Sequence, residues 1–182
     1  MNKHERILLR SSNIWYLGEG LLGPLFAVFA EKIGGDILEI TWAWGVYLLT
    51  TGFLQIFFGR LSDRVSKKKL MFAGYFLNAV FTFCYLLVNN TLGLLLVQAG
   101  LGVAAAMATP TWEALYDKYS SDKKRGTLWG LADGQADIVL GVATLVGGFV
   151  LVRTSFDTLF ILMGCIQIIA VVYLIRIFKL KR

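Results

Sequence analysis

Four acidic side chains lie within long apolar stretches of this sequence, where a carboxylate is costly. They are Glu19, Glu113, Asp133 and Asp137. A charged group in hydrocarbon costs about 3 kcal/mol on insertion scales, so such residues usually face a cavity, a partner or an ion path. No Lys or Arg occurs in the middle of these stretches. A proton or a bound cation is therefore the group expected to neutralise the acids.

Helical spacing places three of these acids at related depths. Glu19 comes nine residues after the preceding Arg, and Asp133 comes eight residues after another Arg. At about 1.5 Å of rise per residue, both carboxylates lie about 12 to 13 Å beyond a basic helix start. Asp137 follows Asp133 by one helical turn and shares its face. The spacing predicts a proton or cation path lined by Glu19, Asp133 and Asp137.

Glu113 and Trp112 extend this candidate site toward one end of a stretch. Trp112 is expected either to line an aromatic cavity beside Glu113 or to anchor a helix end at the membrane interface. A purely structural alternative remains open for all the acids, because a protonated carboxyl can join helices by hydrogen bonds. Its candidate partners are Asn78, Gln98 and Gln135.

The elements that hold these residues are predicted to be membrane-spanning helices. Of 182 residues, 57% are hydrophobic and 16% are charged, whereas soluble domains have about 25% charged residues. This composition excludes a water-soluble domain. A spanning helix needs about 20 apolar residues, which predicts one all-α domain over 1–182 with six spans. Their expected ranges are 12–31, 41–59, 70–89, 92–116, 127–152 and 156–178.

The distribution of basic residues predicts the orientation of the chain. All 18 Lys and Arg residues except Lys32 and Arg153 fall in the two tails and in the second and fourth connections. Under the positive-inside rule, both termini are then cytoplasmic, and a bacterial-type inner membrane or a plasma membrane is expected. The formal charge of +6 follows from this topology, so nucleic acid is not an expected partner.

The connection between the second and third spans carries a motif. It reads GRLSDRVSKKK over residues 59–69 and resembles the G-x-L-a-D-r-x-G-r-k signature of the major facilitator superfamily. The matching positions are Gly59, Leu61, Asp63, Arg64, Lys67 and Lys68, whereas Ser66 replaces the second glycine. The stretch 122–130 and the glycine pair at 147–148 also resemble the family's N-terminal six-helix half.

The resemblance implies a fold and a gate. The fold is one half of a major facilitator transporter, with spans one to three and four to six as inverted repeats. The motif implies a latch of the cytoplasmic gate, in which Arg64 pairs with a carboxylate on a neighbouring helix. Asp117, at the inner end of the fourth span, is the expected partner. Alternatively, the Lys-rich part of the loop only sets the topology.

The resemblance also implies a function. We expect a secondary transporter of a small solute, working by alternating access with proton or cation coupling. Because both termini are expected on one side, two copies can form a parallel C2 homodimer that recreates the two-half architecture. A separately encoded complementary half would make a heterodimer instead. Drug antiporters of the family carry G-P-x-x-G-G in span five, whereas residues 143–148 read ATLVGG, so this motif does not support a multidrug antiporter.

The sequence leaves two other classes of protein to consider. Asp117 and Asp137 lie in contexts that faintly resemble intramembrane aspartyl proteases, but their expected depths differ by roughly 18 Å. A membrane scaffold or assembly partner without transport activity is the other alternative. Cys84 and Cys165 lie in apolar runs as small hydrophobic residues. We expect no enzyme activity, cofactor or metal site.

Overall fold

The computed structural model describes residues 2–120 and 125–180, and all regular structure within these ranges is helical. This confirms the predicted all-α fold. The residues outside these ranges include the first three residues of the 122–130 stretch. The helices are α1 (Lys3–Gly20), α2 (Leu25–Lys32), α3 (Ile37–Ser62), α4 (Lys67–Cys84), η1 (Tyr85–Leu87), α5 (Thr91–Tyr119), α6 (Arg125–Arg153), α7 (Phe156–Leu174) and α8 (Arg176–Lys179).

Polar residues in the connections start several of these helices. Asn2 and Glu5 form a reciprocal capping box at the start of α1, and Asp36 and Glu39 form another at the start of α3. The Asn90 side chain accepts a hydrogen bond from a backbone N–H in the first turn of α5. These bonds satisfy N–H groups that a helix leaves free at its first turn. Short polar connections thus set where the apolar helices begin.

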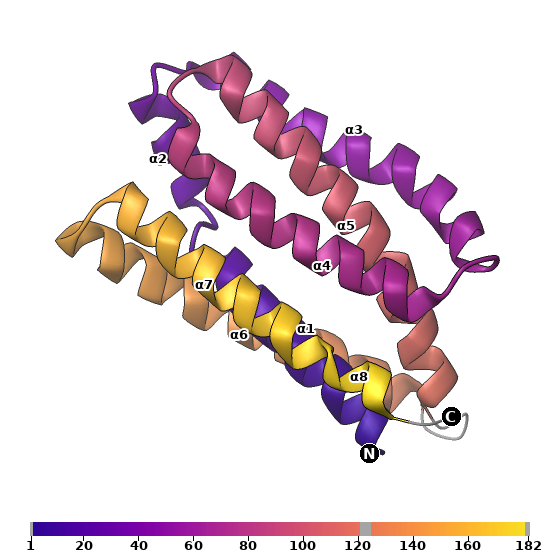
Figure 1. The fold of residues 1–182 in the computed structure, drawn as a ribbon. Coiled ribbons are helices and arrows are strands. Elements are labelled where there is room, and N and C mark those ends of the chain that lie inside the picture. Colours follow the sequence, from indigo (N-terminus) through magenta and orange to yellow (C-terminus); the bar gives the residue numbers. More distant parts are fainter. Residues whose placement is uncertain (1, 121–124, 181–182) are drawn as a thin grey trace.

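The helices form two layers. Contacts run from α3 to α5, from α5 to α1 and from α1 to α6, so these four helices make one layer. Behind it, α4 packs on α5, α7 packs on α1, and α4 and α7 contact each other. Figure 1 views the bundle with α4 and α7 toward the reader. We call α3, α5, α1 and α6 the front layer and α4 and α7 the back layer.

The bundle also divides into two sets of three helices with matching contacts. We call α1, α6 and α7 the α1 triad, and α5, α3 and α4 the α5 triad. Exchanging α1 with α5, α3 with α6 and α4 with α7 reproduces the principal contacts. One hydrogen bond is repeated as well, because Thr144 of α6 donates to the Gly20 carbonyl of α1 (3.1 Å) and Thr51 of α3 donates to the Gly102 carbonyl of α5 (3.4 Å).

Five helical segments among the described residues are long and apolar enough to cross a membrane. They are Ile37–Ser62, Lys67–Leu87, Thr91–Tyr119, Arg125–Arg153 and Phe156–Lys179. They contain the second, fourth, fifth and sixth predicted spans and most of the third. The expected first span, 12–31, is not one continuous helix, because the chain breaks between α1 and α2.

The break follows from the residues at its centre. Gly23 has a φ of +33°, in the left-handed region that favours glycine, and Pro24, which precedes α2, has no N–H to donate. The segment packs closely on α6, where Gly147 contacts the carbonyl of Leu21. A side chain at position 147 would therefore meet the backbone of the broken segment.

The basic segments gather at one end of the bundle. The start of α1, the link from α3 to α4, the junction of α5 and α6, and α8 all lie at the lower right in Figure 1. The connections from α2 to α3, from η1 to α5 and from α6 to α7 lie at the opposite end. We call these the basic end and the opposite end.

Candidate functional site

Glu19 lies where the front layer meets the back layer. Its Oε1 atom accepts a hydrogen bond from Asn78 of α4 at 2.8 Å and another from Gln167 of α7 at 3.3 Å. Gln167 also donates to the carbonyl of Trp15 at 3.3 Å. Both amides are buried. The carboxylate of α1 is therefore held by both back-layer helices at once.

Glu19 also lines a cavity of about 280 Å³, which we call the Glu19 cavity. This volume is just below that of typical small-molecule pockets, which begin near 300 Å³. Its polar lining includes Tyr47 of α3, Gln98 of α5 and Thr144 of α6, so residues from all four front-layer helices meet there. Phe26, Trp44 and Tyr85 contribute aromatic walls.

A second cavity brings together three of the residues singled out in the sequence. Glu113 and Trp112 of α5 and Asp133 of α6 line a space of about 80 Å³ with Trp15 and Tyr16 of α1. We call this the Glu113–Asp133 cavity. Both carboxylates belong to exposed residues on the front layer. Trp112 and Glu113 thus lie together in the lining of this cavity.

Tyr16 lies one helical turn before Glu19 on α1. It lines the Glu113–Asp133 cavity beside Glu113 and Asp133. Asp137 is exposed on α6, one turn beyond Asp133. Glu113 and Asp133 therefore share one cavity with Tyr16, whereas Glu19 lines the other cavity and Asp137 lines neither.

The three acids that line these cavities, Glu19, Glu113 and Asp133, have no basic neighbour in the described linings. Of the described residues that line the two cavities, none is Lys, Arg or His. The ion pairs Lys67–Asp63 and Arg125–Asp117 involve other acids. A proton or a cation from outside the chain is the remaining source of positive charge here.

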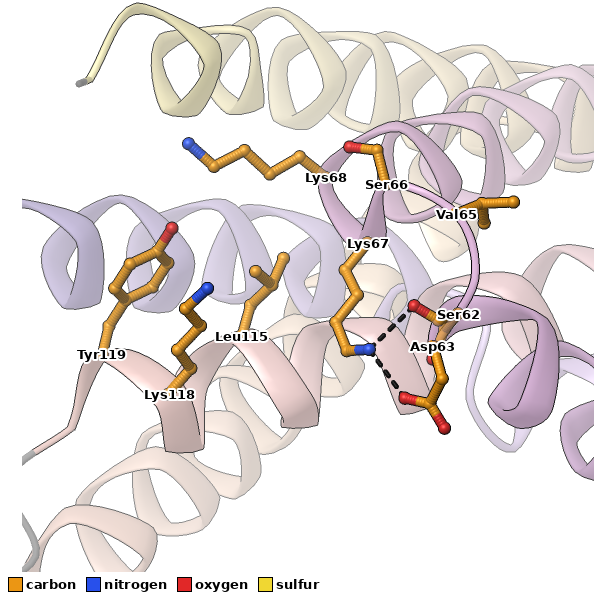
Figure 2. Close-up of a pocket in the computed structure, with 9 residues that line it drawn as sticks. All are labelled: Ser62, Asp63, Val65, Ser66, Lys67, Lys68, Leu115, Lys118 and Tyr119. Atoms are coloured by element: carbon orange, nitrogen blue, oxygen red, sulfur yellow. Dashed lines mark hydrogen bonds and ion pairs between the residues drawn. The ribbon is translucent and has the colours of Figure 1, made fainter. Parts of the chain in front are cut away.

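The sequence motif forms a polar corner at the basic end, shown in Figure 2. Lys67, in the first turn of α4, donates to Asp63 Oδ1 at 2.9 Å and to the Ser62 carbonyl at 2.7 Å. Lys68 reaches α8, where it donates to the Ile177 carbonyl at 2.7 Å. With Lys118 from α5, these residues border a cavity of about 460 Å³. The motif thus joins the α3–α4 link to α4 and α8.

The other motif residues lie apart from this corner. Gly59 is in the last turn of α3, and the space where its Cβ would lie is open. Arg64 borders a shallow pocket with Phe57, Arg60 and Leu61. The ion pair of Asp117 is with Arg125, at 3.6 Å. The described residues show Asp117 paired with Arg125 and not with Arg64, so the expected Arg64–Asp117 pair stays a prediction.

Sequence reasoning missed both Gln167 and Tyr16. Gln167 is the amide within the apolar run of α7 and is fully buried. Its polarity in that run was a usable signal, because buried amides need partners. Tyr16 has no comparable signal, since its role depends on how α1, α5 and α6 pack together.

The family follows from comparison with known proteins. Residues 11–182 match the family model of the Major Facilitator Superfamily. The chain belongs to this superfamily. It is thus a member of a transporter family rather than an enzyme, and its apolar helices are those of an integral membrane protein.

Several curated members of the superfamily resemble the chain. An uncharacterized transporter of Methanocaldococcus jannaschii is 28% identical over 156 residues, which cover 86% of this chain and 40% of the relative. The multidrug resistance protein MdtG of Erwinia billingiae is 20% identical, covering 94% of this chain and 43% of the relative. The riboflavin transporter RibZ of Clostridioides difficile is 25% identical, covering 75% of this chain and 30% of the relative. The chain spans less than half the length of these relatives.

The span-five segment that departs from the drug-antiporter motif has a structural role. Ala143 contacts Gly20, and Thr144 donates to the Gly20 carbonyl. Gly147 packs on the broken segment that follows α1. The residues at 143–147 thus fix α6 against the end of α1, beside the Glu19 cavity.

Proposed function

We propose that this chain is one six-helix half of a secondary active transporter, in which Glu19, Asp133, Asp137 and Glu113 line a solute and proton path. The observation that carries the proposal is that Glu19 lines one cavity and Glu113 and Asp133 line another, with no Lys, Arg or His among the described residues of either lining. A transporter must neutralise such acids during its cycle, which couples solute movement to protons or another cation.

The hydrogen bonds of Glu19 supply a coupling mechanism. Asn78 and Gln167 both donate to its carboxylate, and an ionised carboxylate only accepts. Protonation turns one oxygen into a donor and weakens charge-assisted bonds to these amides. Gain or loss of a proton on α1 therefore changes the attachment of α1 to α4 and α7. Such a change favours one arrangement of the front layer relative to the back layer over another.

A second six-helix half completes the path, and we propose that a second copy of this chain supplies it. The curated relatives are more than twice as long as the matched region. At the two edges of the front layer, α3 and α6 expose glycines at seven-residue spacing, and added Cβ atoms there would meet open space. These are Gly45, Gly52 and Gly59 on α3 and Gly134, Gly141 and Gly148 on α6.

Small residues on such faces let membrane helices approach closely. A parallel C2 dimer pairs each edge with the other edge of its partner, so α3 of one copy meets α6 of the other. The front layers then face each other across the path. This places two sets of the four acids on opposite walls.

The basic end is proposed to be cytoplasmic, in a bacterial-type inner membrane or a plasma membrane. The excess of Lys and Arg at this end supports that orientation, and it puts both termini on the inside. The polar corner of Asp63, Lys67 and Lys68 would then latch the cytoplasmic side, as expected for the motif. Arg64 and Asp117, which are apart here, would meet only in another state of the cycle.

The experiment on function uses the full chain in proteoliposomes on a solid-supported membrane. Currents are recorded for a panel of cationic and neutral solutes under a pH gradient. We expect a solute-driven current that the E19Q/D133N/D137N variant loses and that the E31Q control keeps. Equal currents from the wild type and the triple variant would contradict the acid path and favour the scaffold alternative.

A disulfide test addresses the second copy. In a background where both cysteines are replaced by serine, Gly52→Cys and Gly141→Cys are introduced into one chain. We expect a covalent dimer on oxidation, whereas Gly52→Cys with Val172→Cys, on the outward face of α7, gives none. A strictly monomeric product at high protein density in lipid would contradict the homodimer and point to a complementary half.

A further inference from the structure

The Glu113–Asp133 cavity combines aromatic faces with two carboxylates. Trp112 stacks on Tyr116 with ring centroids 4.9 Å apart, and Trp129 meets Trp112 edge to face at 6.3 Å. On its other side, Trp15 stacks on Tyr75 at 5.2 Å. The aromatic walls come from α1, α4, α5 and α6 and are held by one another. This rigid arrangement keeps the ring faces in place without a ligand.

The chemistry of this lining selects for a positive charge. Aromatic faces attract ammonium groups within about 6 Å of the ring centroid. Glu113 and Asp133 add two carboxylates, and they interact electrostatically with each other. Two neighbouring carboxylates repel each other unless a cation or a proton lies between them. An organic ammonium group satisfies the rings and the carboxylates together.

A buried donor indicates a further feature of the ligand. Trp15 lines this cavity and is 9% exposed, and its indole N–H has no hydrogen-bond partner among the described residues. Leaving a buried donor without a partner is unfavourable. A ligand oxygen close to the ammonium group would accept this hydrogen bond. The cavity therefore fits an ammonium compound with a nearby hydroxyl or carbonyl oxygen.

The size of the cavity limits what enters it. Its volume is about 80 Å³, well below the roughly 300 Å³ at which drug-sized pockets begin. Only a small head group fits among the rings. Glu113 and Asp133 are exposed on the front layer, so the rest of a larger molecule would extend toward the opposite half.

We propose that the Glu113–Asp133 cavity binds the ammonium head of a small organic cation, whose neighbouring oxygen accepts a hydrogen bond from Trp15. The inference rests on the proposed transport function, because it names the class of solute for the same path. It assigns the aromatic cavity to the solute and leaves Glu19, in the other cavity, to the coupling proton.

The test is equilibrium binding to the full chain in lipid nanodiscs, which requires no transport. The probes are choline and its uncharged isostere 3,3-dimethylbutan-1-ol. Isothermal titration calorimetry and tryptophan fluorescence measure the binding of each probe. We expect choline to bind at least ten times more tightly than the neutral isostere. E113Q/D133N should weaken choline at least tenfold, whereas E31Q should leave it unchanged. W15F should weaken choline but leave tetramethylammonium, which has no oxygen, unchanged.

The possible results separate the cation-site proposal from the proposed transport function. Equal binding of choline and its isostere, or choline binding unaffected by E113Q/D133N, overturns the cation site. Unfolding of the double variant would show as a lower melting temperature, and the single variants E113Q and D133N then carry the test. Charge-selective binding without solute-driven current upholds the site and counts against the transporter. Current for other solutes without choline binding upholds the transporter and overturns this site.

Discussion

The α1 triad and the α5 triad share one packing scheme but differ in chemistry. In each, a central helix packs between two others, and a threonine donates to a glycine carbonyl of that helix. Yet Glu19, Asp133 and Asp137 all belong to the α1 triad, whereas the α5 triad supplies Glu113. The two triads therefore show that the scaffold can repeat while the site is built mainly on one copy of it.

The contrast extends to the central helices themselves. Among the described residues, α1 ends at Gly20 and the chain breaks before α2, whereas α5 runs unbroken for 29 residues with Pro110 inside it. The break in α1 lies next to Glu19 and borders its cavity through Gly23. A break in the helix beside the carboxylate suits the helix that carries the proposed coupling group.

The largest expected effect is on coupling by the α1 triad. Glu19→Gln should reduce the pH-dependent part of the transport current by about 10²-fold or more, because a positioned proton-transfer group contributes 10²- to 10⁴-fold. Choline binding in nanodiscs should change less than twofold, since Glu19 lines the other cavity. If Glu19→Gln abolished choline binding but left the pH dependence of the current intact, the roles assigned to the two cavities would be reversed.

The close contacts of the two triads should be equally sensitive to added volume. A Cβ on Gly20 would lie 2.7 Å from the Ala143 Cβ, and one on Gly102 would lie 2.9 Å from the Thr50 Cβ. We expect Gly20→Ala and Gly102→Ala each to destabilise the protein by about 1 to 3 kcal/mol. Thermal unfolding in nanodiscs measures both, with Gly130→Ala as the control at an open position. If only one triad responded, the packing schemes would not be equivalent.

Removing the repeated hydrogen bond separates stability from function. Thr144→Val and Thr51→Val should each cost about 0.6 kcal/mol, the average for such bonds in a membrane. Thr144 also lines the Glu19 cavity, whereas Thr51 does not. We therefore expect similar melting temperatures for the two variants but a lower transport rate for Thr144→Val only. A rate loss in both variants would argue that packing, rather than the cavity, limits transport.

The smallest expected effect is at the basic end, where α1 meets α5. The His4 ring stacks on Tyr119 at 4.1 Å, and burial lowers the pKa of His4 below 6.5, helped by the charge of Lys68. The fold favours neutral His4, so its stabilising contribution is complete above pH 6.5 and is lost as the pH falls toward the lowered pKa. Melting curves from pH 7.5 to 5 should show this decline in the wild type. His4→Gln should show a smaller decline over the same range, and an identical decline would assign the effect to another group.

Much of this fold could be predicted from the sequence, because apolar runs and basic links carry their own signal. The helices α3, α5 and α6 contain their predicted spans, and α7 together with α8 covers the sixth. The motif at Asp63 to Lys68 lies in the predicted link. The sequence also placed Trp112 beside a cavity. These features depend on local composition and helical spacing.

The remainder depends on contacts between distant helices. Glu19 meets Gln167 across 148 positions of sequence, and Asp117 pairs with Arg125 rather than Arg64. The break after Gly20 requires the close approach of α6 as well as Gly23 and Pro24. Such pairings are set by how helices pack, which a single sequence does not encode at any one position.

The most direct test of the central claim is whether the acid-lined face is reached by water from both sides of the membrane in turn. Thr109→Cys, in the lining of the Glu113–Asp133 cavity, is placed in a background without cysteines and treated with a membrane-impermeant thiol reagent from each side of oriented vesicles. Alternating access predicts labelling from either side, with side preference shifted by choline, and no labelling of Val172→Cys on the back layer. Labelling from one side only, unchanged by solute or pH, would contradict a path through this face.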